Sequence, residues 1–297
     1  MLAVDVGGTK VAAGLVDGDG RILARRQTTT SGGGNGPDET FDNLWSIVAP
    51  LVDQADAMGV GCGGPMDGGP GDRRVSPLHI PQWEGLELAE RLAKRSGLDV
   101  MVDNDAKALA LGEGWCGAAA GHENFLALVV STGIGGGIVL NGRLLDGATD
   151  NAGHIGHVVV DPDGAVCTCG SQGCLEAVAS GTAIAEMTGA LAVHAPVAVR
   201  RHVGMMVGRG VAAVVNLLDL PLAVVAGSVA LGFGKPFFDA AGESLSARCG
   251  LTFTRGAQIV PAGLGAHGPL VGAAAVWHHH AGDGVLSGGR LRRGHGD

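Results

Sequence analysis

Short apolar runs bounded by glycine and polar residues recur along the chain and predict buried strands. The first run, LAVDV at residues 2–6, leads through a Gly-Gly-Thr-Lys turn into a second strand over residues 11–17. A DGDG sequence at residues 17–20 then predicts a hairpin turn. Three later runs also predict strands: Val100–Asp105, Phe125–Val130 and Leu222–Ala226.

Segments with apolar residues three or four positions apart alternate with these strands and predict helices. The first is residues 38–57, whose apolar side chains recur on one face. His278–His280 stand at the end of a small-residue run near the C-terminus and read as a tag remnant or a solvated helix end, with no assigned chemistry. Further helices are predicted over residues 86–96, 106–116, 175–190, 203–218 and 270–280.

Two strand–turn–strand segments carry the same kind of loop. The turn Gly7–Lys10 (GGTK) offers bare backbone N–H groups, a hydroxyl and an ammonium, which together are a phosphate cradle in outline. Residues 131–137 (STGIGGG) repeat this arrangement, and a third glycine turn follows at Gly227–Ser228. A Gly-Gly hairpin alone is most often only a turn, but two such loops suggest duplicated domains that close on a polyphosphate.

Polar residues end the strand that begins at Val100. Asp103, Asn104 and Asp105 come directly before a predicted helix, and the carboxyl ends of strands are where α/β proteins bind ligands. Helix capping by Asn104 or Asp105 is the structural alternative, with a contribution of about 1 kcal/mol. A carboxylate at a strand end can accept a hydroxyl proton, so Asp105 is the candidate general base.

Trp83 follows a glycine-rich loop at residues 60–71, where the backbone could approach a small ligand. Its indole could stack on a sugar ring, but a packed core aromatic is at least as good an interpretation.

The densest group of metal-binding side chains lies in residues 152–176 (AGHIGHVVVDPDGAVCTCGSQGCLE). His157, Cys167, Cys169 and Cys174 have the spacing H-x9-C-x-C-x4-C, and Zn²⁺ prefers tetrahedral Cys/His sites of this kind. Glycines and prolines in this stretch would let the backbone turn tightly. Chance clustering of cysteines and surface histidines is the alternative. With four protein ligands the zinc would be structural, because no position remains open for water.

Composition and charge narrow the classes of function. The chain has 297 residues, enough for two domains, and its 46% hydrophobic and 16% charged residues are those of a soluble globular protein. A formal net charge of −9 argues against binding nucleic acid or anionic membranes. Neither a membrane-spanning run nor a signal peptide is found, so we expect a cytoplasmic protein. Clustered cysteines are then metal ligands rather than disulfides.

Together these motifs resemble the repressor–ORF–kinase (ROK) family of sugar kinases, within the actin/hexokinase-like superfamily. The resemblance runs from about residue 2 to residue 277, and the zinc residues are followed, as in the family, by Leu175 and Glu176. The segments similar to the family's two phosphate loops, its adenosine turn and its catalytic strand end are DVGGTK (5–10), STGIGGG (131–137), AGSV (226–229) and VDND (102–105).

The resemblance implies an α/β protein with the two-domain actin/hexokinase-like, ribonuclease-H-like fold and a cleft between the domains. We expect a small domain over residues 1–104, rejoined by a helix at about 268–282, and a large domain over 105–267 that carries the zinc loop. ATP with Mg²⁺ would bind in the cleft, and a hexose would bind deep between the domains. Family members are commonly dimers, so a homodimer or a higher homo-oligomer is expected.

The resemblance also implies roles for single residues. Asp105 would take the proton from the sugar 6-hydroxyl, Asp5 would orient the waters of Mg²⁺, and His157 could bind zinc with one ring nitrogen and the sugar with the other. The residues expected on the nucleotide side are Asp5, Gly7, Gly8, Thr9, Lys10, Thr132, Gly133, Gly227 and Ser228. Those expected on the sugar side are Gly64, Asn104, Asp105, His154, His157 and Glu176.

His154 departs from the family, which usually has a glutamate here (AGHIGH rather than AGEIGH). A carboxylate only accepts hydrogen bonds, whereas a neutral imidazole offers one donor and one acceptor, so hydroxyl recognition must differ at this corner. The GHIGH pattern resembles the N-acetylmannosamine kinases of the family, while its glucose kinases mostly carry the glutamate. Both substrates therefore stay open, and a role as an extra zinc ligand is disfavoured because four are already present.

Three functions fit these observations, and we favour the first, an ATP-dependent kinase for the 6-hydroxyl of a hexose or N-acetylhexosamine. The second is a sugar-responsive regulator of the same family. Such regulators carry a helix-turn-helix before the first phosphate strand, whereas that strand begins here at Leu2, and the acidic charge disfavours DNA binding. The third is a catalytically silent sugar-binding protein that lost activity with the usual glutamate.

Overall fold

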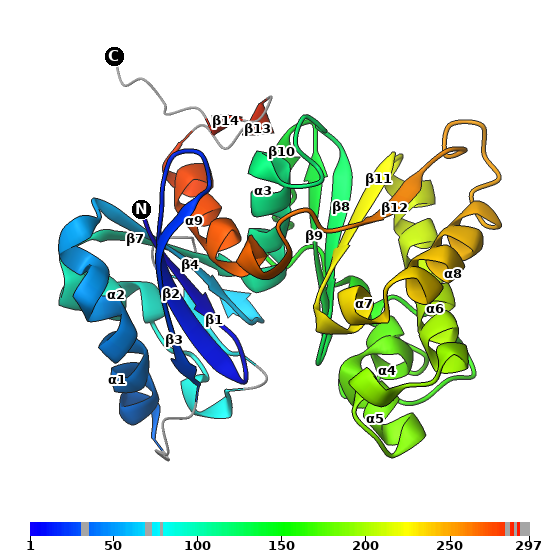
Figure 1. The fold of residues 1–297 in the computed structure, drawn as a ribbon, viewed down its shortest axis with the longest axis horizontal. Coiled ribbons are helices and arrows are strands. Elements are labelled where there is room, and N and C mark those ends of the chain that lie inside the picture. The colour runs from blue at the N-terminus through cyan, green and yellow to red at the C-terminus, as the bar shows by residue number, and fades with distance from the viewer. Residues whose placement is uncertain (31–35, 69–72, 78–79, 283–285, 288–289, 292–297) are drawn as a thin grey trace. The chain divides into compact units, whose positions relative to one another are not determined.

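The computed structural model describes residues 1–30, 36–68, 73–77, 80–282, 286–287 and 290–291, which form the mixed α/β chain drawn in Figure 1. The chain divides into two compact units and re-enters the first of them twice. Unit 1 comprises Met1–Glu123, Gly142–Ala152 and Leu264–Asp297, and unit 2 comprises Asn124–Asn141 and Gly153–Gly263.

Unit 1 is built on a five-stranded sheet of order β3-β2-β1-β4-β7. Strand β1 pairs antiparallel with β2 and parallel with β4, which pairs parallel with β7. The carboxyl ends of β1, β4 and β7 therefore lie at one edge of the sheet. The strands are β1 (Leu2–Val6), β2 (Lys10–Val16), β3 (Ile22–Thr29), β4 (Ala57–Cys62) and β7 (Asp99–Asn104), with a separate pair, β5 (Met66–Asp67) and β6 (Arg74–Val75).

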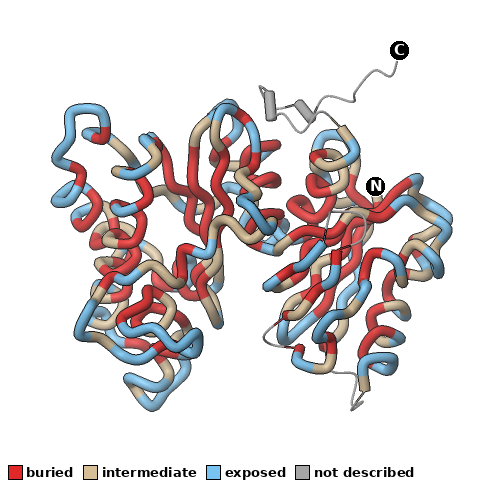
Figure 2. The backbone as a smooth tube through the Cα atoms, turned by 180° about the vertical axis from the view of Figure 1, so that it is seen from behind, coloured by how far each residue is buried: buried red, intermediate tan, exposed pale blue. Residues whose placement is uncertain are grey.

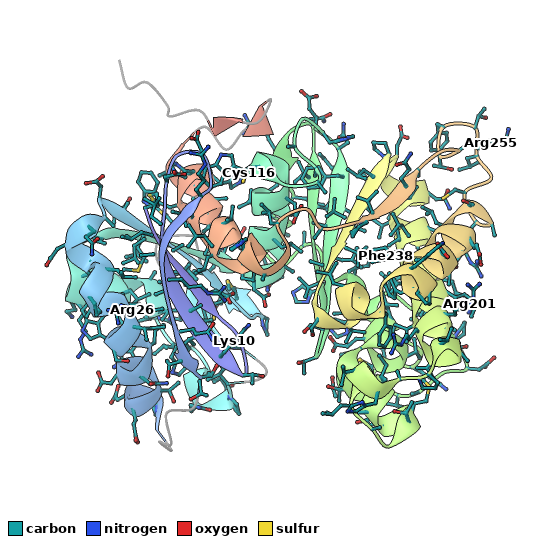
Figure 3. The ribbon with its side chains drawn as sticks, viewed as in Figure 1. Lys10, Arg26, Cys116, Arg201, Phe238 and Arg255 are labelled. Carbon is teal, nitrogen blue, oxygen red and sulfur yellow. The ribbon has the colours of Figure 1, made fainter. Side chains whose placement is uncertain are left out.

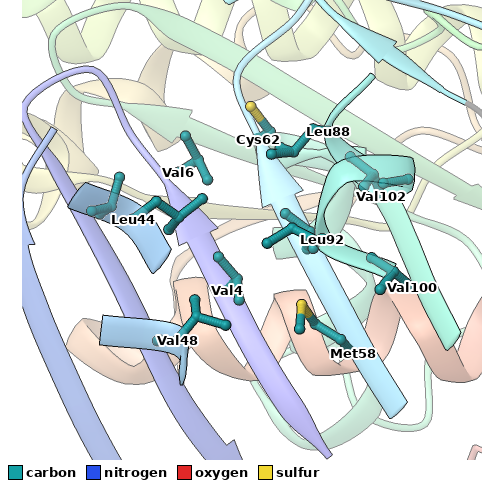
Figure 4. Packing of buried hydrophobic residues seen from close by; sticks show 14 of the residues in the cluster. Val4, Val6, Leu44, Val48, Met58, Cys62, Leu88, Leu92, Val100 and Val102 are labelled. Atoms are coloured by element: carbon teal, nitrogen blue, oxygen red, sulfur yellow. The ribbon is translucent and has the colours of Figure 1, made fainter. Parts of the chain in front are cut away.

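Apolar side chains cover one face of this sheet, because successive residues of a strand point to opposite faces. Val4, Met58 and Val102 belong to one buried cluster with Leu44 and Leu92, which come from two helices on that face (Figure 4). Those helices are α1 (Pro37–Val48) and α2 (Leu88–Ser96).

Glycines allow close packing on the opposite face, of one helix on the sheet and of two helices on each other. A Cβ on Gly59 of β4 would lie 2.0 Å from the carbonyl oxygen of Ala273, so helix α9 rests directly on the strand backbone. A Cβ on Gly112 of α3 would likewise lie 2.9 Å from the backbone of Gly272 in α9. The two helices are α3 (Asp105–Cys116) and α9 (Gly268–Ala281).

Unit 2 contains the strands β9, β8, β11 and β12, in that order, of a second sheet. Its strands are largely buried (Figure 2), and glycines again permit close helix packing: a Cβ on Gly204 of α6 would lie 2.3 Å from the carbonyl oxygen of Phe237 in α8. The strands are β8 (Phe125–Val130), β9 (Ile134–Leu140), β11 (Leu222–Ala226) and β12 (Gln258–Pro261); the short strand β10 (Arg143–Leu144), which continues the order beyond β9, belongs to the residues of unit 1. The helices are α4 (Leu175–Ala179), α5 (Gly181–Thr188), α6 (Val197–Leu218), α7 (Ser228–Phe233) and α8 (Lys235–Ser246).

Several predicted helices have different limits in the structure. The helix expected over 203–218 begins already at Val197, and the helix expected over 86–96 begins at Leu88. The helix expected over residues 38–57 ends at Val48 and continues as a 3₁₀ helix, because Pro50 has no N–H to donate to the preceding turn. The helix expected over 175–190 is broken at Ser180, whose hydroxyl instead accepts from the N–H of Ala183 and caps α5.

The compact units also divide at other residues than the boundary expected at 104/105. Helix α3 lies in unit 1, where it packs along α9, and unit 2 begins at Asn124. Trp83, considered as a sugar-stacking surface, is fully buried in the core of unit 1, and its indole donates to the carbonyl oxygen of Pro37 at 3.3 Å. In the glycine-rich loop predicted at 60–71, residues 69–71 lie outside the described residues. Across the described residues, every helix is too short or too polar to traverse a bilayer.

Candidate functional site

The predicted site residues are divided between the two units, and each group is described within its own unit. Unit 1 holds Asp5, Gly7, Gly8, Thr9, Lys10, Gly64, Asn104 and Asp105. Unit 2 holds Thr132, Gly133, His154, His157, Cys167, Cys169, Cys174, Glu176, Gly227 and Ser228.

Three parallel strands of unit 1 end side by side and bring its predicted residues together. The register pairs Asp5 of β1 with Gly61 of β4, and Gly61 with Asp103 of β7. Beyond these ends, a Cβ on Gly64 would lie 3.0 Å from Nδ2 of Asn104, so the loop after β4 touches the end of β7. The glycine turn after β1, the loop after β4 and the start of α3 thus leave the sheet at the edge where α/β proteins bind ligands.

The first glycine turn is stabilised by a hydrogen bond within the turn and by hydrogen bonds from another segment. The N–H of Gly7 donates to the carbonyl oxygen of Lys10 at 3.1 Å. Thr30, which the sequence did not single out, donates from its hydroxyl to Gly7 at 2.5 Å and from its N–H to Thr9 at 3.1 Å. Gly8, Thr9 and Lys10 are exposed, and Figure 3 labels Lys10 at the start of β2. The turn therefore presents a hydroxyl and an ammonium to solvent.

Asn104 and Asp105 occupy the junction of β7 and α3 with different roles. Asn104 caps the helix, because its side-chain oxygen accepts from the N–H groups of Ala106 at 2.9 Å and Lys107 at 3.4 Å. Asp105 is the first helical residue and is exposed, and one of its oxygens accepts from Ala106 at 2.8 Å. The capping role therefore falls mainly to Asn104, and the Asp105 carboxylate lies where the helix dipole stabilises negative charge.

Asp5 and Asp105 interact electrostatically. Burial and the negative charge of Asp105 raise the pKa of Asp5 to about 7, against the opposing charges of Lys10 and Arg25. Near neutral pH the charged form of Asp5 is therefore favoured by a nearby cation, and Mg²⁺ prefers carboxylate oxygens. Asp5, the predicted magnesium residue, and Asp105, the predicted base, are therefore close enough to interact electrostatically.

In unit 2 the segment predicted as the second phosphate loop and the predicted adenosine turn meet where β8 and β11 end. The hydroxyl oxygens of Ser131 and Ser228 are 3.0 Å apart. Gly227 has a φ of 101°, and a Cβ there would lie 2.2 Å from the carbonyl oxygen of Val130. Only glycine fits this position, because any side chain would strain the backbone and collide with β8.

The start of helix α5 also contacts the predicted second phosphate loop, and the sequence did not predict this contact. The N–H of Gly181 donates to Ser131 at 2.7 Å, and Thr182 donates to the carbonyl oxygen of Thr132 from both its N–H and its hydroxyl, at 3.2 and 3.1 Å. The loop is closed internally by the N–H of Ser131, which donates to Gly133 at 3.0 Å. The signal that could have revealed this contact is the Ser-Gly-Thr triplet that interrupts the predicted helix.

The four predicted zinc residues lie together. The ligand atoms of His157, Cys167, Cys169 and Cys174 are all within 4.8 Å of one another. The Sγ atoms of Cys169 and Cys174 are 3.7 Å apart, and Nδ1 of His157 lies 3.7 Å from Sγ of Cys167. Sulfur ligands about 2.3 Å from a tetrahedral zinc would be about 3.8 Å apart, so this donor set fits the ion. A backbone hydrogen bond from Ser171 lowers the pKa of Cys169 to about 6, which favours a thiolate.

Backbone hydrogen bonds fold the loop that carries these ligands. The carbonyl oxygen of Gly173 accepts from the N–H groups of Val160 at 2.9 Å and Asp161 at 3.2 Å, and the N–H of Cys167 donates to Ser171 at 2.7 Å. Gly173 has a φ of 76°, and a Cβ there would lie 1.8 Å from the carbonyl oxygen of Asp161. The crossing of the two loop segments therefore requires glycine at this position.

His154 and Glu176 flank the cysteine cluster. The exposed ring of His154 stacks on that of His157, with centroids 6.0 Å apart and 20° between the planes. Glu176 is half-buried in the first turn of α4, and its Oε2 accepts from the N–H of Ile134 at 2.7 Å. Glu176 therefore ties α4 to β9, which is a structural role beside the predicted contact with a sugar.

The histidines at the end of α9 are not a tag remnant or a solvated helix end, and that interpretation is wrong. Nε2 of His280 lies 2.7 Å from Oδ2 of Asp103, which is fully buried. His279 is 7% exposed, and burial lowers its pKa to about 4. The small apolar residues of α9 bury the helix, which carries these side chains into unit 1.

The comparisons with known proteins place the chain in a family. Residues 1–280 match the ROK family. The chain belongs to the ROK family. Over 188 residues it is 43% identical to a glucokinase of Thermotoga maritima, a match that covers 62% of this chain and 58% of that protein's length. Over 253 residues it is 36% identical to an N-acetylmannosamine kinase of Yersinia pseudotuberculosis, covering 78% and 84% of the two chains.

A crystal structure from the same family has the same fold. The ROK family glucokinase of Streptomyces griseus, in complex with glucose and AMPPNP, matches with a TM-score of 0.79 and 32% identity, covering 92% of this chain and 97% of that one. The chain thus has the two-domain actin/hexokinase-like fold of the ROK sugar kinases, which confirms the predicted fold class and family.

Proposed function

We propose that the chain is an ATP-dependent sugar kinase that phosphorylates the 6-hydroxyl of a hexose or N-acetylhexosamine, with N-acetylmannosamine and glucose as the leading substrates. Membership of a family whose named relatives are sugar kinases supports the proposal. The observation that carries it is the exposed Asp105 carboxylate at the start of α3, within electrostatic reach of Asp5 at the end of β1.

Asp105 is the general base of the proposed reaction. Its carboxylate accepts the proton of the sugar 6-hydroxyl as the hydroxyl oxygen forms a bond to the γ-phosphorus, and the bond from that phosphorus to the leaving oxygen of ADP breaks. Phosphoryl transfer needs little covalent help from the protein, so positioning and charge stabilisation supply most of the rate enhancement.

The nucleotide would be held by the glycine turns. Gly7–Lys10 and Thr132–Gly133 would bind phosphate oxygens, and Gly227–Ser228 would approach the adenosine. Asp5 would hold Mg²⁺ through its waters, and the ion would neutralise charge on the phosphates when bound. The raised pKa of Asp5 fits this role, since a carboxyl that resists ionisation alone gains most from a cation.

We assign a structural zinc to His157, Cys167, Cys169 and Cys174. Because Nδ1 of His157 faces the sulfur of Cys167, Nε2 is the ring nitrogen that can hydrogen-bond a sugar hydroxyl. The zinc would then fix the orientation of a substrate ligand and take no part in the chemistry.

His154 would change how this corner of the site recognises the sugar, with N-acetylmannosamine and glucose both kept as leading substrates. Its exposed imidazole offers a donor and an acceptor and stacks beside His157, whereas the glutamate common in the family only accepts. Gly64, Asn104 and Glu176 complete the proposed sugar contacts.

The test is a coupled assay of ADP release with a panel of hexoses and N-acetylhexosamines, on the wild-type chain and on Asp105→Asn. We expect turnover with at least one of the two leading sugars and a loss of about 100- to 10,000-fold in kcat in the variant, with sugar binding retained in a thermal-shift assay. Asp99→Asn, at the other end of β7, is the matched control and should keep normal turnover. An Asp105→Asn variant with near-normal kcat would overturn the assignment of the base.

The same panel decides between a kinase and a silent sugar-binding protein. If every sugar leaves ADP release at background while one of them still raises the melting temperature, the chain binds sugar without phosphorylating it.

A further inference from the structure

Unit 1 contains a buried cluster of charged side chains that none of the proposed steps uses. Arg73 and Lys107 are each 1% exposed, and Asp103 between them is fully buried. Oδ1 of Asp103 lies 2.6 Å from Nη1 of Arg73 and 3.5 Å from Nζ of Lys107. Burial disfavours its ionisation, but the hydrogen bond with His280 and the two cations hold the pKa of Asp103 well below its usual range.

Two cations that share one buried carboxylate need further negative charge, and residues 146–152, here called the strap, supply it. Nζ of Lys107 lies 2.6 Å from Oδ1 of Asp146 and donates to the carbonyl oxygen of Asp150 at 3.2 Å. Nη2 of Arg73 lies 3.2 Å from Oδ2 of Asp150. Withdrawing the strap would leave a buried positive charge uncompensated, so the charge balance holds the strap in place.

A third contact fixes the strap to the loop after β4. The side-chain amide of Asn151 accepts from the N–H of Met66 at 3.1 Å and donates to the carbonyl oxygen of Met66 at 2.9 Å, as a paired strand residue would. Met66 is two residues beyond Gly64, the predicted backbone contact for the sugar.

The strap also stands close in the chain to predicted sugar residues. Lys107 lies on the first turn of α3, two residues after Asp105. At its other end the strap runs through Gly153 into His154, and Gly153 is confined because a Cβ there would lie 2.3 Å from the carbonyl oxygen of Gly136. The network therefore anchors the elements that carry Asp105 and Gly64, and the chain segment that leads to His154.

We propose that Arg73 and Lys107 are positioning residues for sugar phosphorylation, which fasten the strap through Asp146 and Asp150 and so fix Asp105 and Gly64. The kinetic part of this proposal rests on the proposed kinase function. The structural part, that these ion pairs hold the strap, does not.

The structural part is tested by amide hydrogen exchange on the full chain and on the double variant Asp146→Asn/Asp150→Asn. This variant keeps Asp103 beside the buried cations, and asparagine tolerates the positive φ of 59° at residue 150. We expect at least about tenfold faster exchange in residues 146–152, with the strands of both sheets unchanged.

Asp239→Asn is the matched control, because its carboxylate also lies 2.6 Å from a lysine, Lys235, and is 40% exposed against 41% for Asp146. The lysine differs, since Lys235 is 83% exposed and Lys107 is buried. The control should leave exchange in the strap unchanged.

The kinetic part is tested by ADP release in the same variants and in Lys107→Met. We expect kcat/KM for the sugar to fall about 10- to 100-fold, with KM for ATP changed less than about twofold. Unchanged exchange in the strap of the double variant overturns the whole proposal. Faster exchange with normal sugar kinetics overturns the positioning role and leaves a purely structural network.

The kinase function and the role of the ion pairs in holding the strap can be refuted independently. A wild-type chain that phosphorylates no sugar removes the kinase function, while hydrogen exchange still decides whether the ion pairs hold the strap. If Lys107→Met does not fold, the double variant alone decides both parts.

Discussion

Asp5 and Asp17 are aspartates of the same hairpin whose surroundings move their pKa values in opposite directions. Asp5 is half-buried at the end of β1, where burial and the charge of Asp105 raise its pKa to about 7. Asp17 follows β2, and a hydrogen bond from the backbone N–H of Arg21 lowers its pKa. The first carboxyl is poised to meet a cation, and the second stabilises a turn.

The raised pKa of Asp5 makes stability depend on pH. The unfolded chain ionises this carboxyl near pH 4 and the folded chain only near pH 7, so folding loses stability as pH rises through that window. Asp5→Asn removes the ionisable group and with it the loss of folding stability at higher pH. We expect its advantage over the wild type, without divalent cations, to grow by about 2–3 kcal/mol between pH 5 and pH 8, as measured by denaturant unfolding.

Asp17→Asn is the control for this pH dependence. A depressed pKa contributes stability that is fully present above the unfolded value, so the effect of Asp17→Asn should be constant from pH 5 to pH 8. Parallel stability curves for Asp5→Asn and the wild type over this range would contradict the raised pKa.

The sequence revealed residues whose partners are near in the chain and missed those whose partners are distant. His157 and the three cysteines lie within 18 positions, so their spacing alone predicted the cluster. Asp103 and His280 are 177 positions apart, and Thr30 lies 23 positions from Gly7. Pairing over such distances depends on how strands and helices assemble, which local patterns do not contain.

At the scale of elements, helix α7 (Ser228–Phe233) is bounded by two glycines that differ in what surrounds them. Both have positive φ, 101° at Gly227 and 59° at Gly234. A Cβ on Gly227 would meet the backbone of Val130 at 2.2 Å, whereas a Cβ on Gly234 would meet nothing within 4 Å. A side chain would strain the backbone at both glycines. It would collide with a neighbouring strand only at Gly227, in the predicted adenosine turn.

Alanine substitutions at the two ends separate strain from collision. Gly234→Ala should lower the free energy of unfolding by about 1–3 kcal/mol, which is the usual cost of a residue held in such a conformation. Gly227→Ala should lower it further, and raise KM for ATP, because the added Cβ displaces Ser228 or β8. Denaturant unfolding and ATP kinetics measure both effects; equal losses of stability would show that the collision relaxes without cost.

Strand positions were more predictable than helix limits. Short continuous apolar runs placed β1, β8 and β11, because strands buried on both faces need apolar residues at nearly every position. The helical spacing of apolar residues continued through Pro50 and Ser180. A missing backbone donor ends the first helix there, and a competing side-chain hydroxyl breaks the second.

Contacts between residues far apart in the chain were also not predictable. The side chain of Glu113 is buried in α3 and accepts from the N–H of Leu264 at 3.0 Å, although the two residues are 151 positions apart.

At the scale of the whole molecule, the four proposed zinc ligands all lie in unit 2, so removing the metal should act on that unit. Protein purified without added zinc should contain about one zinc per chain, from its four ligands. Chelation should lower the melting temperature by about 5–10 °C, because metal binding contributes to folding.

Unit-resolved hydrogen exchange provides the control within the same molecule. After chelation, amides around the cysteine loop and α4 should exchange faster, while β1, β4 and β7 of unit 1 should be unchanged. A metal-free protein with unchanged stability and turnover would refute the structural role of the metal.

The return of helix α9 to unit 1 has a consequence for folding on the ribosome. Unit 1 contains the N-terminal residues, but α9 can cover its part of the glycine-bearing face of the sheet only when Gly268–Ala281 have been made. All of unit 2, which ends at Gly263, leaves the ribosome before that helix does. Unit 1, whose N-terminal part is synthesised first, is therefore completed last. Until α9 is made, the part of its sheet that α9 will cover is the surface that chaperones would meet.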